Sequence, residues 1–114
     1  MNWELWLQAF LLTHVIEIPV WLLASRRLSV PRRFLVVFGP SCITHPVVWC
    51  AFPWDAWPYL PTLVLAEAFA VVGEALYVRW LGVAHAWRWS LAANAASLGI
   101  GFLILEALAR LALG

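Results

Sequence analysis

Four long apolar stretches, separated by short polar connections, limit what this chain can fold into. They cover residues 3–24, 34–52, 60–81 and 89–113. A helix needs about 20 mostly apolar residues to cross the hydrocarbon core of a bilayer, and each stretch is close to that length. Only helices and closed barrels satisfy their own backbone hydrogen bonds inside a membrane. The sequence therefore predicts an all-α fold in which residues 1–114 form a single integral membrane domain with four transmembrane helices.

The composition agrees with a membrane location. Hydrophobic residues make up 65% of the 114 residues and charged residues 11%, whereas a soluble domain is about 45–50% apolar and about 25% charged. The net charge of +1 gives no electrostatic basis for binding nucleic acid. The N-terminal MNWELW has no basic segment, so we expect a retained helix rather than a cleaved signal peptide. Cys42 and Cys50 form no C-x-x-C motif and are expected to be small buried hydrophobic residues.

The orientation of the helices follows from the arginines. Short connections make neighbouring helices antiparallel, which predicts an up-down-up-down bundle. Six of the seven basic residues lie in or beside the first and third connections: Arg26, Arg27, Arg32, Arg33, Arg79 and Arg88. The positive-inside rule then places those connections in the cytoplasm and both termini outside. The first four of these arginines fix the topology and can also contact anionic lipid headgroups. All nine tryptophans fall near span ends, the depth expected for interfacial rings.

Several polar side chains lie inside the apolar stretches. Ionisable residues at such depth are costly and usually face the bundle interior or a water-filled cavity. We predict a buried polar cluster for a proton or cation, formed by Glu17, Glu67, Glu74, His14, Thr44, His45, Asn94 and Ser97. The helical rise places Glu17, Glu74, Asn94 and Ser97 in one layer, with His14, His45, Thr44 and Glu67 about 10 Å further out. An isolated carboxylate in hydrocarbon takes a proton or finds a cation.

Prolines and small residues are expected to shape two of the helices. Pro40 and Pro46 each remove a backbone donor and are expected to break the second helix. Ala93, Ser97 and Gly101 recur every four residues, which predicts a helix-packing seam.

Glu106 is assigned to a different environment from the other glutamates of the spans. Arg110 follows it by one turn, in the favourable acid-first order. A long arginine side chain near a helix end can reach the membrane surface. We therefore expect an interfacial ion pair.

The pattern favours proton or small-cation handling, or transport, by an oligomer. The alternative is a non-catalytic accessory or assembly subunit of a larger membrane complex. The expected partners are the lipid bilayer and either further copies of the chain or a larger membrane-protein complex. A metal site built from His14, Glu17, His45 and Glu67 would lack the second Glu-x-x-His of di-iron bundles, and neither a metal nor another cofactor is predicted. The sequence contains no nucleophile–base–acid set and no cofactor fingerprint, so no catalytic residue is predicted. An intramembrane hydrolase that uses Glu and His residues is the least favoured alternative.

The motifs IEIPVWLL, THPVVW, EAFAVVGEAL and SLAANAASLGIG, one in each span, together carry a family resemblance. The chain resembles a group of small uncharacterised bacterial four-helix inner-membrane proteins. These carry Glu-Pro, Thr-(Asn/His)-Pro, paired glutamates and Asn-x-x-Ser in successive spans. The resemblance implies a four-helix fold and a bacterial inner (plasma) membrane, but no reaction; with the orientation from the arginines, the termini are expected to be periplasmic. It favours as working set Glu17, Thr44, His45, Pro46, Glu67, Glu74, Asn94 and Ser97. Because the group accepts Asn at the position of His45, it does not require that residue to titrate.

Overall fold

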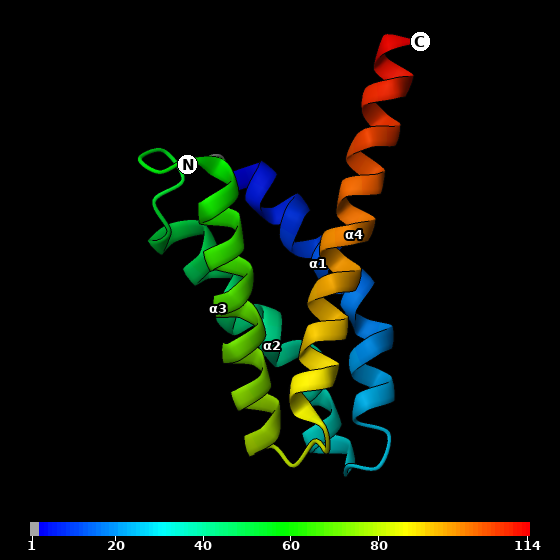
Figure 1. Ribbon diagram of the computed structural model, residues 1–114. Coiled ribbons are helices and arrows are strands. Elements are labelled where there is room, and N and C mark those ends of the chain that lie inside the picture. Colours follow the sequence, from blue (N-terminus) through cyan, green and yellow to red (C-terminus); the bar gives the residue numbers. More distant parts are fainter. Residues whose placement is uncertain (1–2) are drawn as a thin grey trace.

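The computed structural model describes residues 3–114 (Figure 1), and the side chains of all of these except Trp3, Leu5, Trp6 and Leu105. Four α-helices follow one another: α1 (Trp3–Ala24), α2 (Val30–Ala51), α3 (Tyr59–Trp80) and α4 (Ala86–Leu113). All four are long and apolar enough to cross a membrane. The prediction of an all-α fold with four candidate membrane spans is confirmed.

The helix boundaries follow backbone chemistry. α2 begins at Val30, four residues earlier than predicted, with Pro31 in its first turn, where the missing N–H is not needed. The reversal between α3 and α4 uses Gly82 at φ 99° and His85 at φ 55°. Glycine adopts such a left-handed conformation without steric cost, so α3 and α4 are joined by a tight connection.

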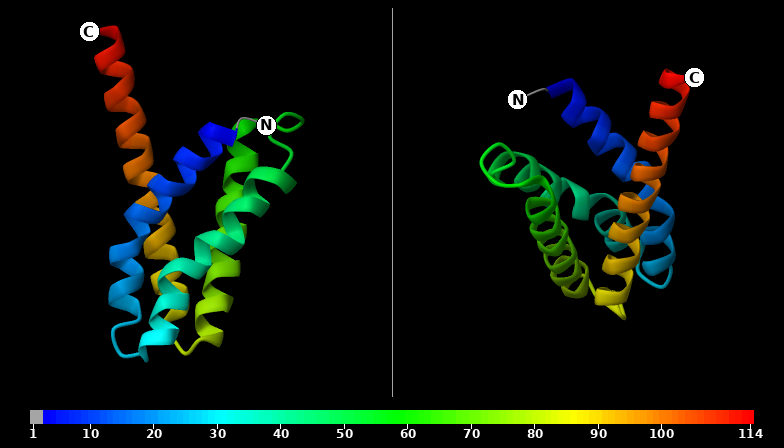
Figure 2. Two further views of the ribbon diagram at one scale, coloured as in Figure 1. Left: turned by 180° about the vertical axis from the view of Figure 1, so that it is seen from behind. Right: turned by 45° about the horizontal axis from the view of Figure 1, so that its top comes forward.

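The prediction that Pro40 and Pro46 break α2 is wrong, because the helix continues through both prolines. Instead, α2 follows a bent path (Figure 2), as expected where a proline removes one hydrogen bond of the helix. α1 also bends midway (Figure 2). Its Pro19 cannot donate to the carbonyl oxygen of Val15, which accounts for a bend in that helix.

The helices pack as a ring in which each one contacts two neighbours. α1 lies against α2 and α4, and α3 lies against α2 and α4. Within residues 3–114 the diagonal pairs, α1 with α3 and α2 with α4, have no Cα atoms within 8 Å of each other. The axis of the ring is therefore occupied by side chains and by any space that they leave.

One end of the ring is closed by a buried apolar cluster. This is the end that carries the α1–α2 and α3–α4 connections. Its members come from all four helices and the α3–α4 connection: Trp21, Val36, Val37, Val78, Leu81, Val83, Ala86 and Ala93. Trp21 is 1% exposed. Although it lies near the expected end of its helix, it faces the interior of the bundle rather than the surface of the chain. Trp3 and Trp6 lie outside the described side chains.

The opposite end of the ring is splayed. The N-terminal half of α1 and the C-terminal half of α4 diverge (Figure 2), and α4 projects beyond the other helices (Figure 1). With 28 residues, α4 is about 42 Å long, more than the roughly 30 Å of a hydrocarbon core. The predicted seam therefore ends early. Ala93 is buried, but a Cβ atom added at Gly101 would meet nothing within 4 Å.

The prediction of two buried cysteines is also wrong. Cys42 and Cys50 are both exposed on the outer surface of α2. An apolar sequence context does not distinguish the interior of a small bundle from its lipid-facing side, because both are apolar. The inward face of α2 is instead marked by the buried Ser41 and Thr44.

α2 and α3 approach closely at Gly39. The hydroxyl group of Tyr77 donates to the carbonyl oxygen of Leu35 at 3.0 Å. A Cβ atom added at Gly39 would overlap the phenol ring of Tyr77. We expect Gly39→Ala to displace Tyr77 and destabilise the fold by about 1–3 kcal/mol, the usual range for overpacking, measured by thermal unfolding in detergent.

Gly73→Ala is the matched control for this substitution. An added Cβ atom at Gly73 would meet only the Cγ2 atom of Thr44, at 3.6 Å, which is an ordinary contact. The expected melting temperature of this variant is at least that of the wild type. Equal melting temperatures for the Gly39→Ala and Gly73→Ala variants would contradict the close approach.

Candidate functional site

A cavity of about 410 Å³ lies on the axis of the ring, next to the buried apolar cluster. Its walls come from all four helices and from the α2–α3 connection. Glu17 and Glu74 line the cavity and are each 2% exposed, whereas Tyr59, which also lines it, is 59% exposed. The cavity is therefore closed at the two glutamates and opens towards Tyr59.

Glu74 is held between two neighbouring helices. On one side, the hydroxyl group of Thr44 on α2 lies 2.5 Å from Glu74 Oε2. On the other side, Asn94 Nδ2 on α4 donates to Glu74 Oε1 at 3.0 Å. The second amide hydrogen of Asn94 is donated to the carbonyl oxygen of Ser90 at 2.9 Å. The carboxyl group of Glu74 thus connects α2, α3 and α4 at one point.

The bond between Thr44 and Glu74 corrects the predicted layering. Thr44 was expected one layer further out, with the histidines, but it reaches Glu74 directly. The bend of α2 contributes to this change of depth, because a helical rise of about 1.5 Å per residue assumes a straight helix along the bundle axis. The closed end of the cavity therefore contains Thr44 as well as Glu17, Glu74 and Asn94.

The hydroxyl oxygen of Thr44 has two possible acceptors for a single proton. Besides Glu74 Oε2, it lies 3.0 Å from the carbonyl oxygen of Pro40. If Glu74 is neutral, its own proton is donated to Thr44, and Thr44 donates to Pro40. If Glu74 is ionised, the hydroxyl group rotates and donates to Glu74. The Thr44 side chain can therefore satisfy Glu74 in either protonation state without moving a helix.

Glu17 occupies the neighbouring wall of the cavity. Trp21 Nε1, one turn later on α1, donates to Glu17 Oε1 at 3.3 Å. The side chain of Ser97 on α4 faces the carboxyl group of Glu17. Glu17 and Glu74 also lie close enough to interact electrostatically. The two carboxyl groups from α1 and α3 therefore form one site rather than two independent ones.

Glu67 lies nearer the open end of the cavity. It is half-buried and interacts electrostatically with both Glu17 and Glu74. Within the described part of the chain, no protein side chain or backbone group forms a hydrogen bond with its carboxyl group. Glu67 also lines a shallower hollow of about 190 Å³ that continues along α4 to Gly101 and Phe102. It is thus the carboxyl group best placed to meet a ligand.

The two histidines that were predicted to belong to the polar cluster, His14 and His45, differ in their positions. His45 lines the cavity, but His14 does not. Instead, the rings of His14 and Phe10 stack with centroids 5.1 Å apart, and His14 also lies 5.6 Å from the ring of Phe38. His45 contacts the edge of Phe10 at 5.3 Å. The prediction that His14 belongs to the polar cluster is therefore wrong, since α1 turns this residue towards the aromatic rings of α1 and α2.

The structure brings the remaining predicted residues together around the cavity. Those on its walls are Glu17, Glu67, Glu74, Thr44, His45, Asn94 and Ser97. Among the described residues, no three His, Cys, Asp or Glu side chains converge as they would around a metal ion. The four-residue ligand set considered from the sequence is thus not assembled.

Three aromatic residues of the cavity were not predicted as part of the site. Trp49, Trp54 and Tyr59 line its outer part. Trp54 Nε1 donates to the carbonyl oxygen of Val48 at 2.8 Å, which fixes the indole against the end of α2. No local pattern indicates this arrangement, because it depends on how the α2–α3 connection folds back. The hydrogen bond from Trp21 to Glu17, by contrast, could have been predicted from the sequence, since Trp21 follows Glu17 by one helical turn.

Glu106 lies away from the cavity. Arg110 Nη2 donates to Glu106 Oε1 at 2.6 Å, and both side chains are largely exposed. The predicted ion pair of Glu106 and Arg110 is confirmed. Glu106 therefore provides a carboxyl group in the same chain that is outside the cavity.

Comparison with known proteins assigns neither a family nor a function to the chain. No family model, no curated protein and no solved structure matches the chain. The chemistry of the cavity is therefore the basis for considering function.

The contact between Thr44 and Glu74 can be tested through stability. Thr44→Val keeps the shape of the side chain but removes the hydroxyl group, which leaves one oxygen of a buried carboxyl group without its partner. We expect a loss of about 1–3 kcal/mol in the free energy of unfolding, measured by denaturant titration in mixed micelles.

The matched control is Thr62→Val. Thr62 is equally buried and its hydroxyl group donates only to the carbonyl oxygen of Pro58, at 2.8 Å, so a smaller loss is expected. In a Glu74→Leu background the two threonine substitutions are expected to cost about the same. An undiminished cost of Thr44→Val in that background would show that its effect does not act through Glu74.

Proposed function

We propose that the chain is a multi-pass protein of a bacterial inner membrane whose cavity takes up and releases protons or a small cation. One observation carries this proposal. The carboxyl groups of Glu17, Glu67 and Glu74 surround a single cavity inside the chain, and none of the residues that line it is an arginine. Apart from the imidazole of His45, which also lines the cavity, positive charge to balance them comes from the surroundings.

Electrostatics explains why this arrangement favours cation exchange. Three ionised carboxylates in one poorly hydrated space would repel one another, and each would lose solvation. Protons or a bound cation remove this cost, and their departure restores it. The rotatable hydroxyl group of Thr44 can satisfy Glu74 before and after such a change. The site can therefore change its proton content without rearranging the backbone.

The position of the cavity supports exchange with one compartment at a time. It opens towards Tyr59, whereas the buried apolar cluster closes the other end. Transport would require a second conformation in which the apolar cluster separates. The halves of α1 and α4 that diverge (Figure 2) carry exposed apolar side chains such as Leu11 and Leu103. A second copy could pack there, which supports an oligomer.

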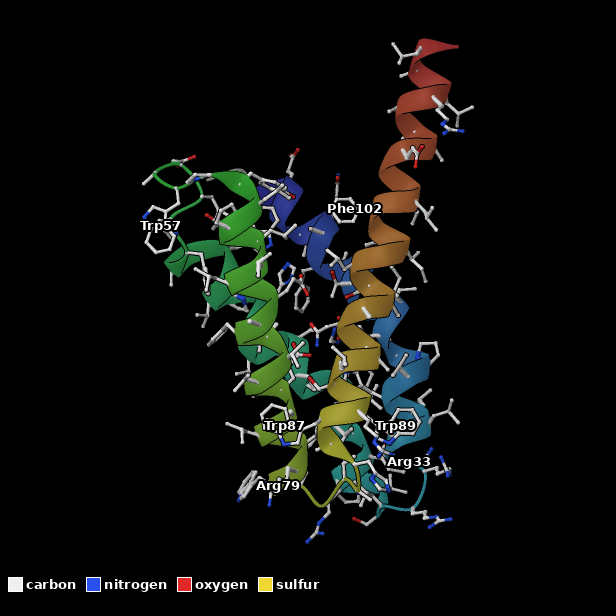
Figure 3. All side chains as sticks on the ribbon, in the orientation of Figure 1. Arg33, Trp57, Arg79, Trp87, Trp89 and Phe102 are labelled. Atoms are coloured by element: carbon white, nitrogen blue, oxygen red, sulfur yellow. The ribbon has the colours of Figure 1, made fainter. Side chains whose placement is uncertain are left out.

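The proposed orientation places the open end of the cavity outside the cell. Arg33 and Arg79 lie at one end of the bundle with Trp87 and Trp89, and Trp57 lies at the opposite end (Figure 3). An end rich in arginine is retained in the cytoplasm. Both termini, the α2–α3 connection and the cavity entrance would then face the periplasm.

An accessory subunit of a larger complex is the second candidate. It requires the glutamates to pack against another chain. Glu17 and Glu74, however, are already enclosed by this chain and partnered by Trp21, Thr44 and Asn94. This enclosure favours a function that resides in the chain itself.

Proton movement provides the direct test. The pure protein is reconstituted in liposomes that contain a pH-sensitive dye, and a proton gradient is imposed. We expect wild-type flux above that of empty liposomes and a loss of at least tenfold in Glu74→Gln, because an amide cannot exchange the proton. Glu106→Gln is the matched control and is expected to keep wild-type flux. Absence of flux from folded wild-type protein, together with co-purifying membrane subunits, would favour the accessory role.

The orientation can be tested with reporter fusions in bacterial cells. Alkaline phosphatase is active only outside the cytoplasm. We expect an active enzyme when it is fused after Gly114 and an inactive one when it is fused after Gly82, because the flanking arginines hold that connection inside. The reverse pattern of activities would invert the proposed topology.

A further inference from the structure

We infer that the cavity binds an organic cation with an apolar body, such as an aryl- or alkylammonium ion. This inference rests on the proposed function, because it assigns a class of ligand to the same carboxyl groups. It is carried by the size of the cavity and by the way its polar and aromatic walls are arranged.

The volume of the cavity exceeds what an inorganic ion needs. It measures about 410 Å³, whereas one water molecule takes up roughly 30 Å³ of liquid volume. Pockets for small organic ligands begin at about 300 Å³. A site for a bare ion would instead surround it closely with oxygen ligands. The dimensions of the cavity therefore favour an organic cation over a bare inorganic ion.

The walls of the cavity differ in character along its length. The closed end presents the carboxyl groups of Glu17 and Glu74, and Glu67 lies between them and the aromatic rings of the outer part. Most of the surface between these groups is apolar, from residues such as Ala70, Leu63 and Val48. A ligand that matches this pattern carries a positive charge at one end and hydrocarbon at the other.

The outer part of the cavity offers aromatic rings to a cation. The rings of Trp54 and Tyr59 lie 5.9 Å apart, and those of His45 and Trp49 lie 6.0 Å apart. Aromatic faces attract alkylammonium groups and are used in proteins to recognise them. A cation that enters past Tyr59 would thus meet aromatic rings first and the carboxyl group of Glu67 next.

The shallower hollow along α4 extends this space sideways. It shares Thr13, Tyr59, Glu67 and Ser97 with the main cavity and continues to Gly101 and Phe102. A Cβ atom at Gly101 would meet nothing within 4 Å. Because α1 and α4 diverge here, an apolar tail can extend towards the bilayer while the charged group stays near Glu67.

Binding to the purified full chain tests this inference. Isothermal titration calorimetry in detergent at neutral pH uses benzyltrimethylammonium as the cation, with benzyl alcohol and phenylacetate as neutral and anionic probes of related shape. We expect saturable binding of the cation near one equivalent per chain, and at least tenfold weaker binding of the other two. Equal binding of all three probes would overturn the assignment, since it would reflect partition into apolar surface.

Two pairs of variants locate the binding site. Glu67→Gln is expected to weaken binding of the cation at least tenfold, and Glu106→Gln is expected to leave it unchanged. Tyr59→Leu is expected to weaken binding about two- to fivefold, the size of an exposed cation–π contact. Trp57→Leu, two residues earlier in the chain and outside the cavity, is expected to have no effect. Each variant is first required to match the wild type in thermal unfolding. Wild-type affinity in a folded Glu67→Gln variant would overturn the proposed site.

A third pair examines the side hollow. Gly101→Leu would fill it, whereas Gly99→Leu adds the same side chain at a position of α4 that is also open but does not line either space. Decyltrimethylammonium, a cation with a long tail, is expected to bind several-fold more weakly to Gly101→Leu than to Gly99→Leu. Equal affinities would remove the hollow from the site.

The outcomes separate this inference from the proposed function. Proton flux that depends on Glu74, without saturable binding of the organic cation, would overturn the inference and leave the proposed function standing. Neither flux nor binding from folded protein would overturn both. If both proposals hold, we expect benzyltrimethylammonium to inhibit the proton flux of the wild type. We expect it not to inhibit the proton flux of the Glu67→Gln variant.

Discussion

The structure depends on how a buried carboxyl group is satisfied. Glu74 is 2% exposed, and a buried carboxyl group is tolerated only with good partners. Thr44 from α2 and Asn94 from α4 supply them. Because these partners come from different helices, the carboxyl group fixes the positions of α2 and α4 relative to α3. Apolar packing against lipid-like surroundings would not by itself select one arrangement, since lipid chains are as apolar as leucine.

This polar junction also explains why the cavity lies where it does. On one side of it, Trp21 and the other members of the apolar cluster close the ring. On the other side, α1 and α4 diverge, and the space between the helices is lined by Glu67 and by the aromatic residues Trp49, Trp54 and Tyr59. The closed end of the bundle thus holds the glutamates in place, while the cavity opens at the splayed end.

Some features were predictable because they depend on local composition and periodicity. The four apolar stretches form four helices that are long and apolar enough to cross a membrane, and the i, i+4 spacing of Glu106 and Arg110 produces the ion pair that is observed. Other features were not predictable from spacing. His14 lies outside the cavity and Cys42 is exposed, and neither position follows from helical spacing alone. In an apolar chain, moreover, the lipid-facing and inward faces have similar composition, so periodicity marks the inward face only where polar residues occur.

The sequence by itself determined the class of fold, the number of spans and the identity of the glutamates that have to be buried, because hydrophobic length and the cost of charge in hydrocarbon act on each segment separately. Only the tertiary structure decided which groups meet. It joined Thr44 to Glu74, moved His14 to the aromatic rings and brought Trp54 and Tyr59 over the cavity. The contact between Thr44 and Glu74 links residues 30 apart in the chain, and the geometry of the cavity depends on the helix bends and on the path of one connection. No local pattern encodes that geometry, because it results from the packing of all four helices together.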